Sequence, residues 1–386
     1  MIPVEPAITE YLHRKASVAR IPLSGSFELT PVCNMSCKMC YVRMTRQQQE
    51  AIAPLHSAAE WLALAAEAKN HGLLYILLTG GEPFLHPEFR QILEGLHRMG
   101  FVISINSNGT MIDEACVDWL KECPPNRVNI TLYGASNETY ARLCGNPKGF
   151  TQVTRAIQLL TDAGISVKLN CSVTPHNASD FDAIMAFARE HDLVIQSSSY
   201  MFPPLRRDPT MIGRNERLDP EEAAYFSAKI ELAMSGRDAF LSRPDISLPP
   251  LSGDTDESCG CDGESIRCRA GRCSFWVTWE GRLMPCGMIP VKGEKSVFEQ
   301  DFMLCWGDAV RAADAIRLPA KCAACALKDT CRTCAAMVIT ETGAYDCAPK
   351  YRCAMAEAYP AARMCLKNEI LSSAAPEAVG MEDTYE

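Results

Sequence analysis

The stretch "FELTPVCNMSCKMCY" (27–41) joins a short apolar strand candidate to three cysteines and an aromatic residue. Cys33, Cys37 and Cys40 are one too many for a disulfide and one too few for a closed tetrahedral zinc site. Thiolates at this spacing suit three irons of a four-iron cluster, and the fourth iron then stays open to a substrate or cofactor. The strand and the loop together predict a reactive metal centre at the end of a strand.

The same strand candidate begins a regular alternation of short apolar runs and amphipathic stretches. Runs rich in β-branched and aromatic residues predict six strands, at 27–31, 73–80, 101–106, 127–134, 167–174 and 193–200. Helices are predicted between and after them, at 57–70, 87–98, 112–122, 137–144, 150–163 and 178–191. Six successive β–α units imply a parallel sheet, and we expect an α/β fold with a partial (β/α)6 TIM-like barrel. In such barrels the chemistry lies at the C-terminal ends of the strands.

The composition is that of a globular protein with two or three domains. The 386 residues are 47% hydrophobic and 22% charged, with a formal net charge of -9. Because no basic run and no apolar run of about 18 residues occurs, we expect neither nucleic-acid binding nor a membrane span. The N-terminus lacks the apolar core of a signal peptide, which favours the cytoplasm.

Twenty cysteines in a cytoplasmic chain indicate metal sites rather than disulfides. They gather in three groups, at 33–40, between Cys259 and Cys286, and between Cys322 and Cys353. The last two groups lie in a region with little periodicity, where metal sites must replace an apolar core. The remaining cysteines are expected to be small buried hydrophobes: Cys116, Cys123, Cys144, Cys171, Cys305 and Cys365.

These patterns divide the chain into five segments. We expect an N-terminal extension (1–25), the barrel (26–240), a linker (241–265), a small cysteine-rich α+β domain (266–370) and a disordered tail (371–386). The linker is rich in Pro, Gly and Ser, and the tail is too polar to fold.

The spacing CxxxCxxC followed by Tyr41 resembles the signature of the radical S-adenosylmethionine (SAM) superfamily. The resemblance implies a [4Fe-4S] cluster on the three cysteines whose open iron binds S-adenosyl-L-methionine. It also implies reductive cleavage of this cofactor to a 5′-deoxyadenosyl radical, which abstracts hydrogen from the substrate. A flavodoxin or ferredoxin is the expected electron donor.

Three later stretches occupy places where that family contacts its cofactor. They are "TGGEP" (79–83), "NSNGT" (106–110) and "NITLYG" (129–134), and each ends a predicted strand. The family usually has Ser-Leu-Asp-Gly where this chain has "TLYG". The resemblance assigns the ammonium of the methionyl group to Glu82 and its carboxylate to Arg142. The full set of implied cofactor contacts is Tyr41, Gly80, Gly81, Glu82, Asn106, Asn108, Thr131 and Arg142.

The second half resembles the SPASM extension of the same superfamily, written C-x9–15-G-x4-C, then CxxCx5Cx3C, then a last cysteine. Here two residues rather than three separate Cys331 from Cys334. The resemblance implies two auxiliary [4Fe-4S] clusters. The nearer would be held by Cys268, Cys273, Cys286 and Cys334, and the outer by Cys322, Cys325, Cys331 and Cys353. Cys259 and Cys261 have no place in the pattern, and Cys347 is an alternative ligand for the position of Cys334 or Cys353.

Enzymes with these two domains mostly modify peptides or proteins. We therefore expect a monomeric enzyme that oxidatively modifies a residue of a peptide, for example by a thioether or other crosslink in a ribosomally made peptide. No separate peptide-recognition domain is expected within residues 1–25. Four arginines after the sixth predicted strand are candidates for binding an acidic peptide or for pairing with local acids: Arg206, Arg207, Arg214 and Arg217.

Three alternatives remain. The first is a radical SAM enzyme acting on a small molecule or cofactor precursor. The second is a sulfatase-maturing enzyme, although such relatives carry an aspartate where this chain has Gly287. The third is a zinc or iron–sulfur scaffold protein, in which His13 or His71 completes the first site and residues 322–334 form a zinc ribbon.

Overall fold

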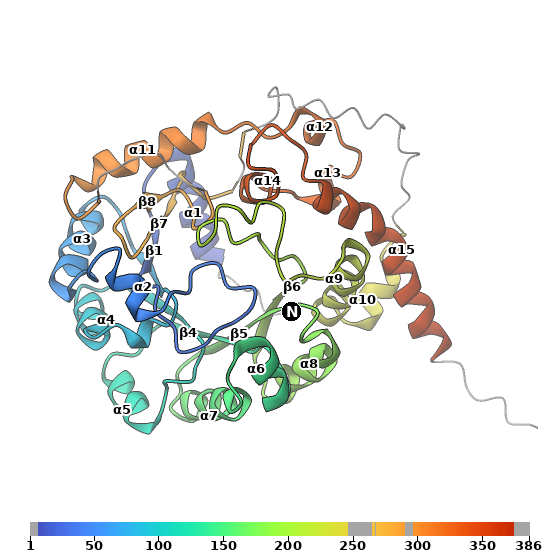
Figure 1. Cartoon of the computed structure of the whole chain (residues 1–386), viewed down its shortest axis with the longest axis horizontal. Helices are drawn as coiled ribbons and strands as arrows, with labels where there is room; N and C mark the ends of the chain where they lie inside the picture. Colours follow the sequence, from blue (N-terminus) through green and yellow to red (C-terminus); the bar gives the residue numbers. More distant parts are fainter. Residues whose placement is uncertain (1–6, 246–264, 267, 290–295, 374–386) are drawn as a thin grey trace, which may run out of the picture.

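The computed structural model describes residues 7–245, 265–266, 268–289 and 296–373, and it confirms the partial barrel. Within these residues one curved sheet has the strand order β6-β5-β4-β3-β2-β1-β7-β8 (Figure 1). All neighbouring strands are parallel except β8, which is antiparallel to β7. The strands are β1 (Ser24–Glu28), β2 (Tyr75–Thr79), β3 (Val102–Ser107), β4 (Arg127–Thr131), β5 (Val167–Ser172), β6 (Val194–Ser198), β7 (Ser274–Val277) and β8 (Leu283–Met284).

The predicted helices surround the sheet (Figure 1). They are α3 (Ala58–Asn70), α4 (Phe89–Arg98), α5 (Glu114–Glu122), α6 (Asn137–Cys144), α7 (Gly149–Asp162) and α8 (Phe181–Glu190). Helix α3 begins at Ser57, whose side chain accepts a hydrogen bond from the backbone of Glu60 while the Glu60 side chain caps the backbone of Ser57. This capping box, in the stretch "SAAE" (57–60), satisfies two backbone donors that a helix N-terminus otherwise leaves unpaired.

Side chains alternate across the strands, so that each strand has an apolar outer face and a polar inner face. Val128, Ile130 and Leu169 are fully buried in the core beneath the helices. Residues between them, such as Asn129 and Lys168, therefore point to the interior of the barrel. The inner face of these strands is thus polar.

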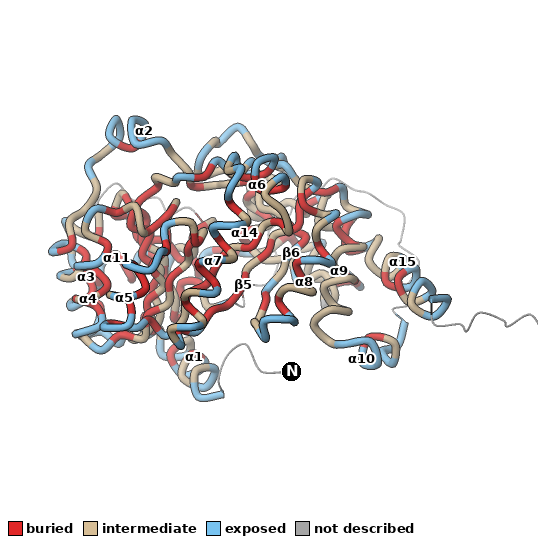
Figure 2. Tube along the Cα trace, turned by 90° about the horizontal axis from the view of Figure 1, so that it is seen from below, coloured by how far each residue is buried: buried red, intermediate tan, exposed pale blue. Residues whose placement is uncertain are grey.

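The remaining helices were not predicted or were predicted only in outline. They are α1 (Ala7–Ala19), α2 (Arg46–Glu50), α9 (Pro220–Ser235), α10 (Arg237–Ser242), α11 (Phe302–Ala315), α12 (Ala320–Ala323), α13 (Lys328–Cys331), α14 (Ala335–Thr342) and α15 (Lys350–Ser372). The described residues also form two short 3-10 helices, η1 (Pro83–Leu85) and η2 (Ala178–Asp180). Helix α1 lies below the sheet, at the N-terminal ends of the strands (Figure 2).

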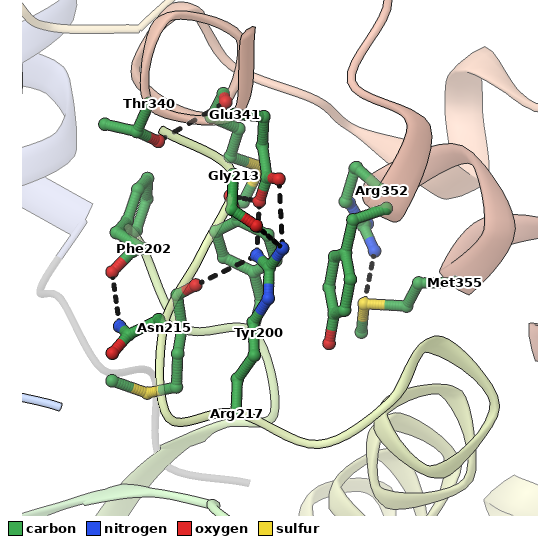
Figure 3. A network of polar contacts seen from close by, with 12 residues as sticks. Tyr200, Phe202, Gly213, Asn215, Arg217, Thr340, Glu341, Arg352 and Met355 are labelled. Carbon is green, nitrogen blue, oxygen red and sulfur yellow. Dashed lines mark hydrogen bonds and ion pairs between the residues drawn. The ribbon is translucent and has the colours of Figure 1, made fainter. Parts of the chain in front are cut away.

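The C-terminal part is joined to the barrel by a buried polar network (Figure 3). Arg217, after β6, forms an ion pair with Glu341 of α14 at 2.5 Å, and the two side chains are 8% and 3% exposed. The Tyr200 hydroxyl donates to Glu341 at 2.7 Å, and the Arg217 guanidinium lies 3.5 Å from the centre of the Tyr351 ring. The predicted tail beyond residue 373 and most of the predicted linker lie outside the described residues.

Candidate active site

The three-cysteine loop follows β1 and lies at the C-terminal ends of the parallel strands, as predicted. The loop is fixed to α6, because the backbone N–H of Ser36 donates to the carbonyl of Cys144 at 2.8 Å. The sulfur of Cys33 accepts hydrogen bonds from the backbone of Met35 at 3.4 Å and from Nδ2 of Asn108 at 3.6 Å. The sulfur of Cys40 accepts one from the backbone of Arg43 at 3.3 Å. Such N–H donors stabilise sulfur that carries negative charge.

The environment of these sulfurs suits a cluster. Cys33 is close enough to Cys37 and Cys40 for their charges to act on it, and burial raises the pKa of its thiol to about 12. No three His, Cys, Asp or Glu side chains of the described chain gather tightly enough for a single metal ion. A four-iron cluster needs wider spacing, because each cysteine binds a different iron. The three cysteines therefore fit the cluster that the sequence predicts.

The histidines proposed for a zinc site lie elsewhere. His13 is buried and stacks on Tyr75 with a ring separation of 5.3 Å. His71 ends α3 and stacks on Phe302. Tyr75 begins β2, so His13 lies at the end of the sheet opposite to the cysteine loop. The zinc alternative with His13 is therefore wrong for this structure.

The two glycines of "TGGEP" allow the end of β2 to lie against the segment that leads into Cys33. A Cβ atom on Gly80 would lie 2.3 Å from the carbonyl oxygen of Thr30, and one on Gly81 would lie 2.5 Å from those of Pro31 and Val32. The backbone of Gly81 donates to the carbonyl of Thr30 at 2.7 Å. The glycines thus position the cysteine loop, a structural task that the sequence pattern did not specify.

Glu82 is completely buried at the end of β2. Its Oε1 accepts hydrogen bonds from the backbone of Phe84 at 3.2 Å and from the hydroxyl of Ser107 at 3.0 Å, and its Oε2 accepts one from the backbone of Asn108 at 2.8 Å. Burial without a cation raises the pKa of Glu82 to about 7. Oε2 keeps room for a second donor, which a ligand ammonium would supply.

The two asparagines of "NSNGT" form hydrogen bonds to the cysteine loop and to β4. Asn108 donates from Nδ2 to Oδ1 of Asn34 at 2.9 Å as well as to Cys33, while Oδ1 of Asn106 accepts a hydrogen bond from Asn129 at 2.8 Å. Asn34 also donates to the hydroxyl of Thr110 at 2.8 Å. Asn34 was not predicted, although its place directly after Cys33 is a signal that could have found it.

Thr131 and Arg142 lie on β4 and on the helix that follows it, α6. Thr131 is the last residue of β4, on the inner face, and its carbonyl accepts from the Tyr140 hydroxyl at 3.3 Å. Arg142 donates from Nε and Nη2 to the carbonyl of His176, at 3.2 and 2.8 Å, and its side chain is 41% exposed. In this structure Arg142 thus supports the loop after β5.

A buried ion pair beside the loop was not predicted. Glu28, the inward-facing end of β1, is 1% exposed and pairs with Arg206 through two contacts of 2.8 and 2.9 Å. The indole of Trp276 donates to the same carboxylate at 3.0 Å. Burial raises the pKa of Tyr41, whose ring lies 5.9 Å from the Arg206 guanidinium. Arg206 and Arg217 are thus held by Glu28 and Glu341, which are far away in the sequence, and not by the local acids that were considered.

The auxiliary cysteines are only partly gathered. A cavity of about 700 Å³ is lined by all four cysteines predicted for the outer cluster, and by Cys268 and Cys334 of the nearer one. Burial, and to a smaller extent the charges of Cys334 and Cys268, raise the pKa of Cys286, so these three cysteines lie near one another. Cys273 is instead fully buried against α1, where it accepts a hydrogen bond from the Ser17 hydroxyl at 3.1 Å. The outer set fits a four-iron cluster as it stands.

The other cysteines are in part as expected. Cys116, Cys123, Cys144, Cys171 and Cys305 are buried and free, but Cys365 is free and exposed on α15. Cys365 is therefore not the buried hydrophobe that was predicted. Cys347 is disulfide-bonded in this structure. Cys259 and Cys261 lie outside the described residues.

Comparison with known proteins agrees with this arrangement. Residues 27–188 match the family described as the Radical SAM superfamily. The AdoMet-dependent heme synthase of Methanosarcina barkeri is 23% identical over 340 residues, which are 85% of this chain and 95% of that protein. The antilisterial bacteriocin subtilosin biosynthesis protein AlbA of Bacillus subtilis is 26% identical over 70% of this chain, but the match spans only 56% of AlbA.

A solved structure shares the fold over most of the chain. The crystal structure of Streptococcus suis SuiB bound to precursor peptide SuiA superposes with a TM-score of 0.64 and 16% identity, covering 91% of this chain and 82% of SuiB. Residues 27–188 form a radical SAM domain. Members of this family use a [4Fe-4S] cluster and S-adenosyl-L-methionine as cofactors, and the rest of the chain shares the fold of SuiB. Among the described residues no helix is both long and apolar enough to cross a bilayer.

Proposed function

We propose that this enzyme oxidatively modifies a residue of a peptide or protein, such as by forming a thioether or other crosslink in a ribosomally made peptide. When bound, the cluster and S-adenosyl-L-methionine supply the radical that removes a hydrogen atom. Cys33, Cys37 and Cys40 hold the reactive cluster. Glu82 receives the ammonium of the cofactor, and the inner ends of β3 and β4, with Asn106, Asn108 and Thr131, orient the rest of it.

The observation that carries this proposal is that the part with the auxiliary cysteines adds a strand to the sheet that carries the reactive loop. The reactive loop follows β1, and the strand next to β1, β7, belongs to the part that holds the auxiliary cysteines. We infer two auxiliary clusters, which accept the electron that an oxidised substrate radical must give up. The names of AlbA and of the SuiB complex support a peptide substrate. We further propose that a flavodoxin or ferredoxin donates the electron to the reactive cluster. The enzyme is proposed to be a monomer located in the cytoplasm.

A second candidate is a small substrate such as a cofactor precursor. It is favoured by the match to the heme synthase over 95% of that protein's length. Formylglycine formation is not favoured, because the backbone carbonyl of Gly287 accepts from Arg206 and a Cβ atom there would lie 3.0 Å from the Trp276 ring. An aspartate side chain at this position would thus press against the indole.

The test uses the full chain with clusters reconstituted without oxygen. Reduced enzyme is mixed with S-adenosyl-L-methionine and candidate peptides, and 5′-deoxyadenosine and peptide mass are followed. We expect a loss of two hydrogens from the peptide for each 5′-deoxyadenosine formed. Turnover with a small precursor and with no peptide would contradict the proposal.

A variant pair tests the ligand assignment. Cys37→Ala should abolish cofactor cleavage while keeping about eight of about twelve irons, because two clusters remain. Cys365→Ala, which removes an exposed cysteine of α15, is the matched control and should keep all the iron and the activity. Cofactor cleavage by Cys37→Ala would overturn the placement of the reactive cluster.

A further inference from the structure

The inner face of β4 and β5 carries two cations. Arg127 begins β4 and Lys168 is the second residue of β5, and both alternate with core residues that face the helices. The Cα pairing of Asn129 with Lys168 and of Asn106 with Asn129 places Lys168 in one layer with the two asparagines, and Arg127 precedes Asn129 by two residues on the same face of β4. This layer includes Asn106 of the "NSNGT" stretch beside the reactive loop.

Neither cation has a counter-charge in the described part of the chain. Lys168 is 7% exposed and donates to the side-chain oxygen of Gln196 on β6. The Nε of Arg127 is buried and has no hydrogen-bond partner. Burial, and then the charge of Arg127, lower the pKa of Lys168, and burial lowers that of Arg127. A buried lysine beside a half-buried arginine, without an anion, is unfavourable for the folded chain on its own.

Amide groups complete the surroundings. Asn129 is 7% exposed and its Oδ1 has no partner, while its Nδ2 is committed to Asn106. On the edge strand β6, Gln196 and Ser198 share the inner face and are exposed. A ligand can therefore reach Lys168 from the open side of the barrel, past β6.

We propose that Arg127 and Lys168 bind a carboxylate of the substrate and so select which of its residues faces the reactive centre. This inference rests on the proposed function, since a peptide offers carboxylates at acidic side chains and at its C-terminus. The planar guanidinium of Arg127 matches both oxygens of a carboxylate, and Lys168 supplies a compact second charge. The enzyme then prefers a peptide that is acidic near the modified residue.

The test measures binding rather than turnover. Full-chain enzyme with its clusters and S-adenosyl-L-methionine is titrated by equilibrium dialysis with the capped peptide acetyl-Gly-Glu-Gly-amide, with the same peptide carrying Gln, and with glutarate. We expect the Glu peptide to bind about tenfold tighter than the Gln peptide, as one charged hydrogen-bonded contact provides. Lys168→Met should lose this preference, Lys168→Arg should keep most of it, and Lys121→Met, at an exposed lysine of α5, should keep all of it.

A second readout shows that the variant is folded. Lys168→Met removes an uncompensated buried charge, so its thermal midpoint without ligand should rise above that of the wild type. The proposal is overturned if the wild type shows no preference for Glu, if Lys168→Met retains it, or if Lys168→Met weakens binding of S-adenosyl-L-methionine as much as that of the Glu peptide. Glutarate binding as tightly as the Glu peptide would uphold the carboxylate site but contradict a peptide substrate.

Discussion

At the scale of the residue, the two buried carboxylates at the strand ends differ because their partners differ. Glu28 has the Arg206 guanidinium and the Trp276 indole, so its charge is compensated inside the protein. Glu82 has only neutral donors, and its pKa is raised to about 7. A carboxyl with that pKa changes its charge near neutral pH.

Binding of S-adenosyl-L-methionine should therefore depend on pH through Glu82. Below about pH 7 the free enzyme holds a proton on this carboxyl, which must leave before an ammonium can bind, so affinity should fall by up to about tenfold per pH unit. Above pH 7 the affinity should level off. Equilibrium dialysis between pH 6 and 8.5 measures this, and Glu82→Gln should give weaker binding with a flat profile. A flat profile in the wild type would contradict the role of Glu82.

The Glu28–Arg206 pair should be costly to break from one side. Arg206→Met leaves a carboxylate that is 1% exposed without its cation, and we expect a loss of about 3–5 kcal/mol in the free energy of unfolding. The double variant Glu28→Gln, Arg206→Met should recover most of that loss. Thermal unfolding of the cluster-loaded protein compares the three, and equal midpoints for the single and double variants would disprove the pairing.

At the scale of the element, the glycine pair after β2 determines where the cysteine loop lies. Gly81→Ala places a methyl group 2.5 Å from the carbonyls of Pro31 and Val32, so the loop must shift. We expect loss of about four irons and of cofactor cleavage, because the first cluster loses its geometry. Gly307→Ala, within α11, is the control and should keep both. Full iron content in Gly81→Ala would show that the loop tolerates the shift.

The sequence predicted the barrel elements well because β-branched runs and helical spacing alternate there without interruption. It missed β7, since "SFWV" is only four residues long and lies between cysteines. It also missed α15, whose buried positions are few and which contains Pro360. Short strands are defined by the neighbour they pair with, here β1, and local sequence does not contain that information.

The same limit applies to the site. Cys33, Glu82 and Asn108 could be predicted because they lie at strand ends in recognisable stretches, and the structure brings them together. Glu28 and Trp276, which are 248 residues apart, meet only after folding. Arg142 and Cys273 were assigned by resemblance alone. In the structure Arg142 donates to the carbonyl of His176, and Cys273 accepts from the Ser17 hydroxyl.

At the scale of the whole molecule, the Arg217–Glu341 network fastens α14 to the barrel. Glu341→Gln leaves a buried guanidinium without its counter-charge, and we expect about 3–5 kcal/mol lower stability and faster hydrogen exchange across α14. Glu138→Gln removes an exposed ion pair with Arg142 and is the matched control, with no change expected in α14. Unchanged exchange in Glu341→Gln would show that other contacts hold α14.

Strand β7 also has a consequence for electron flow. Its parallel ladder with β1, from Ser24 and Ser274 to Phe27 and Val277, joins the part that holds the auxiliary cysteines to the sheet that carries the reactive loop. Electron tunnelling slows steeply with distance, and backbone hydrogen bonds keep that distance constant without any docking step. Raising the solvent viscosity with glycerol should therefore slow the entry of substrate and leave the rate of electron tunnelling inside the protein unaltered.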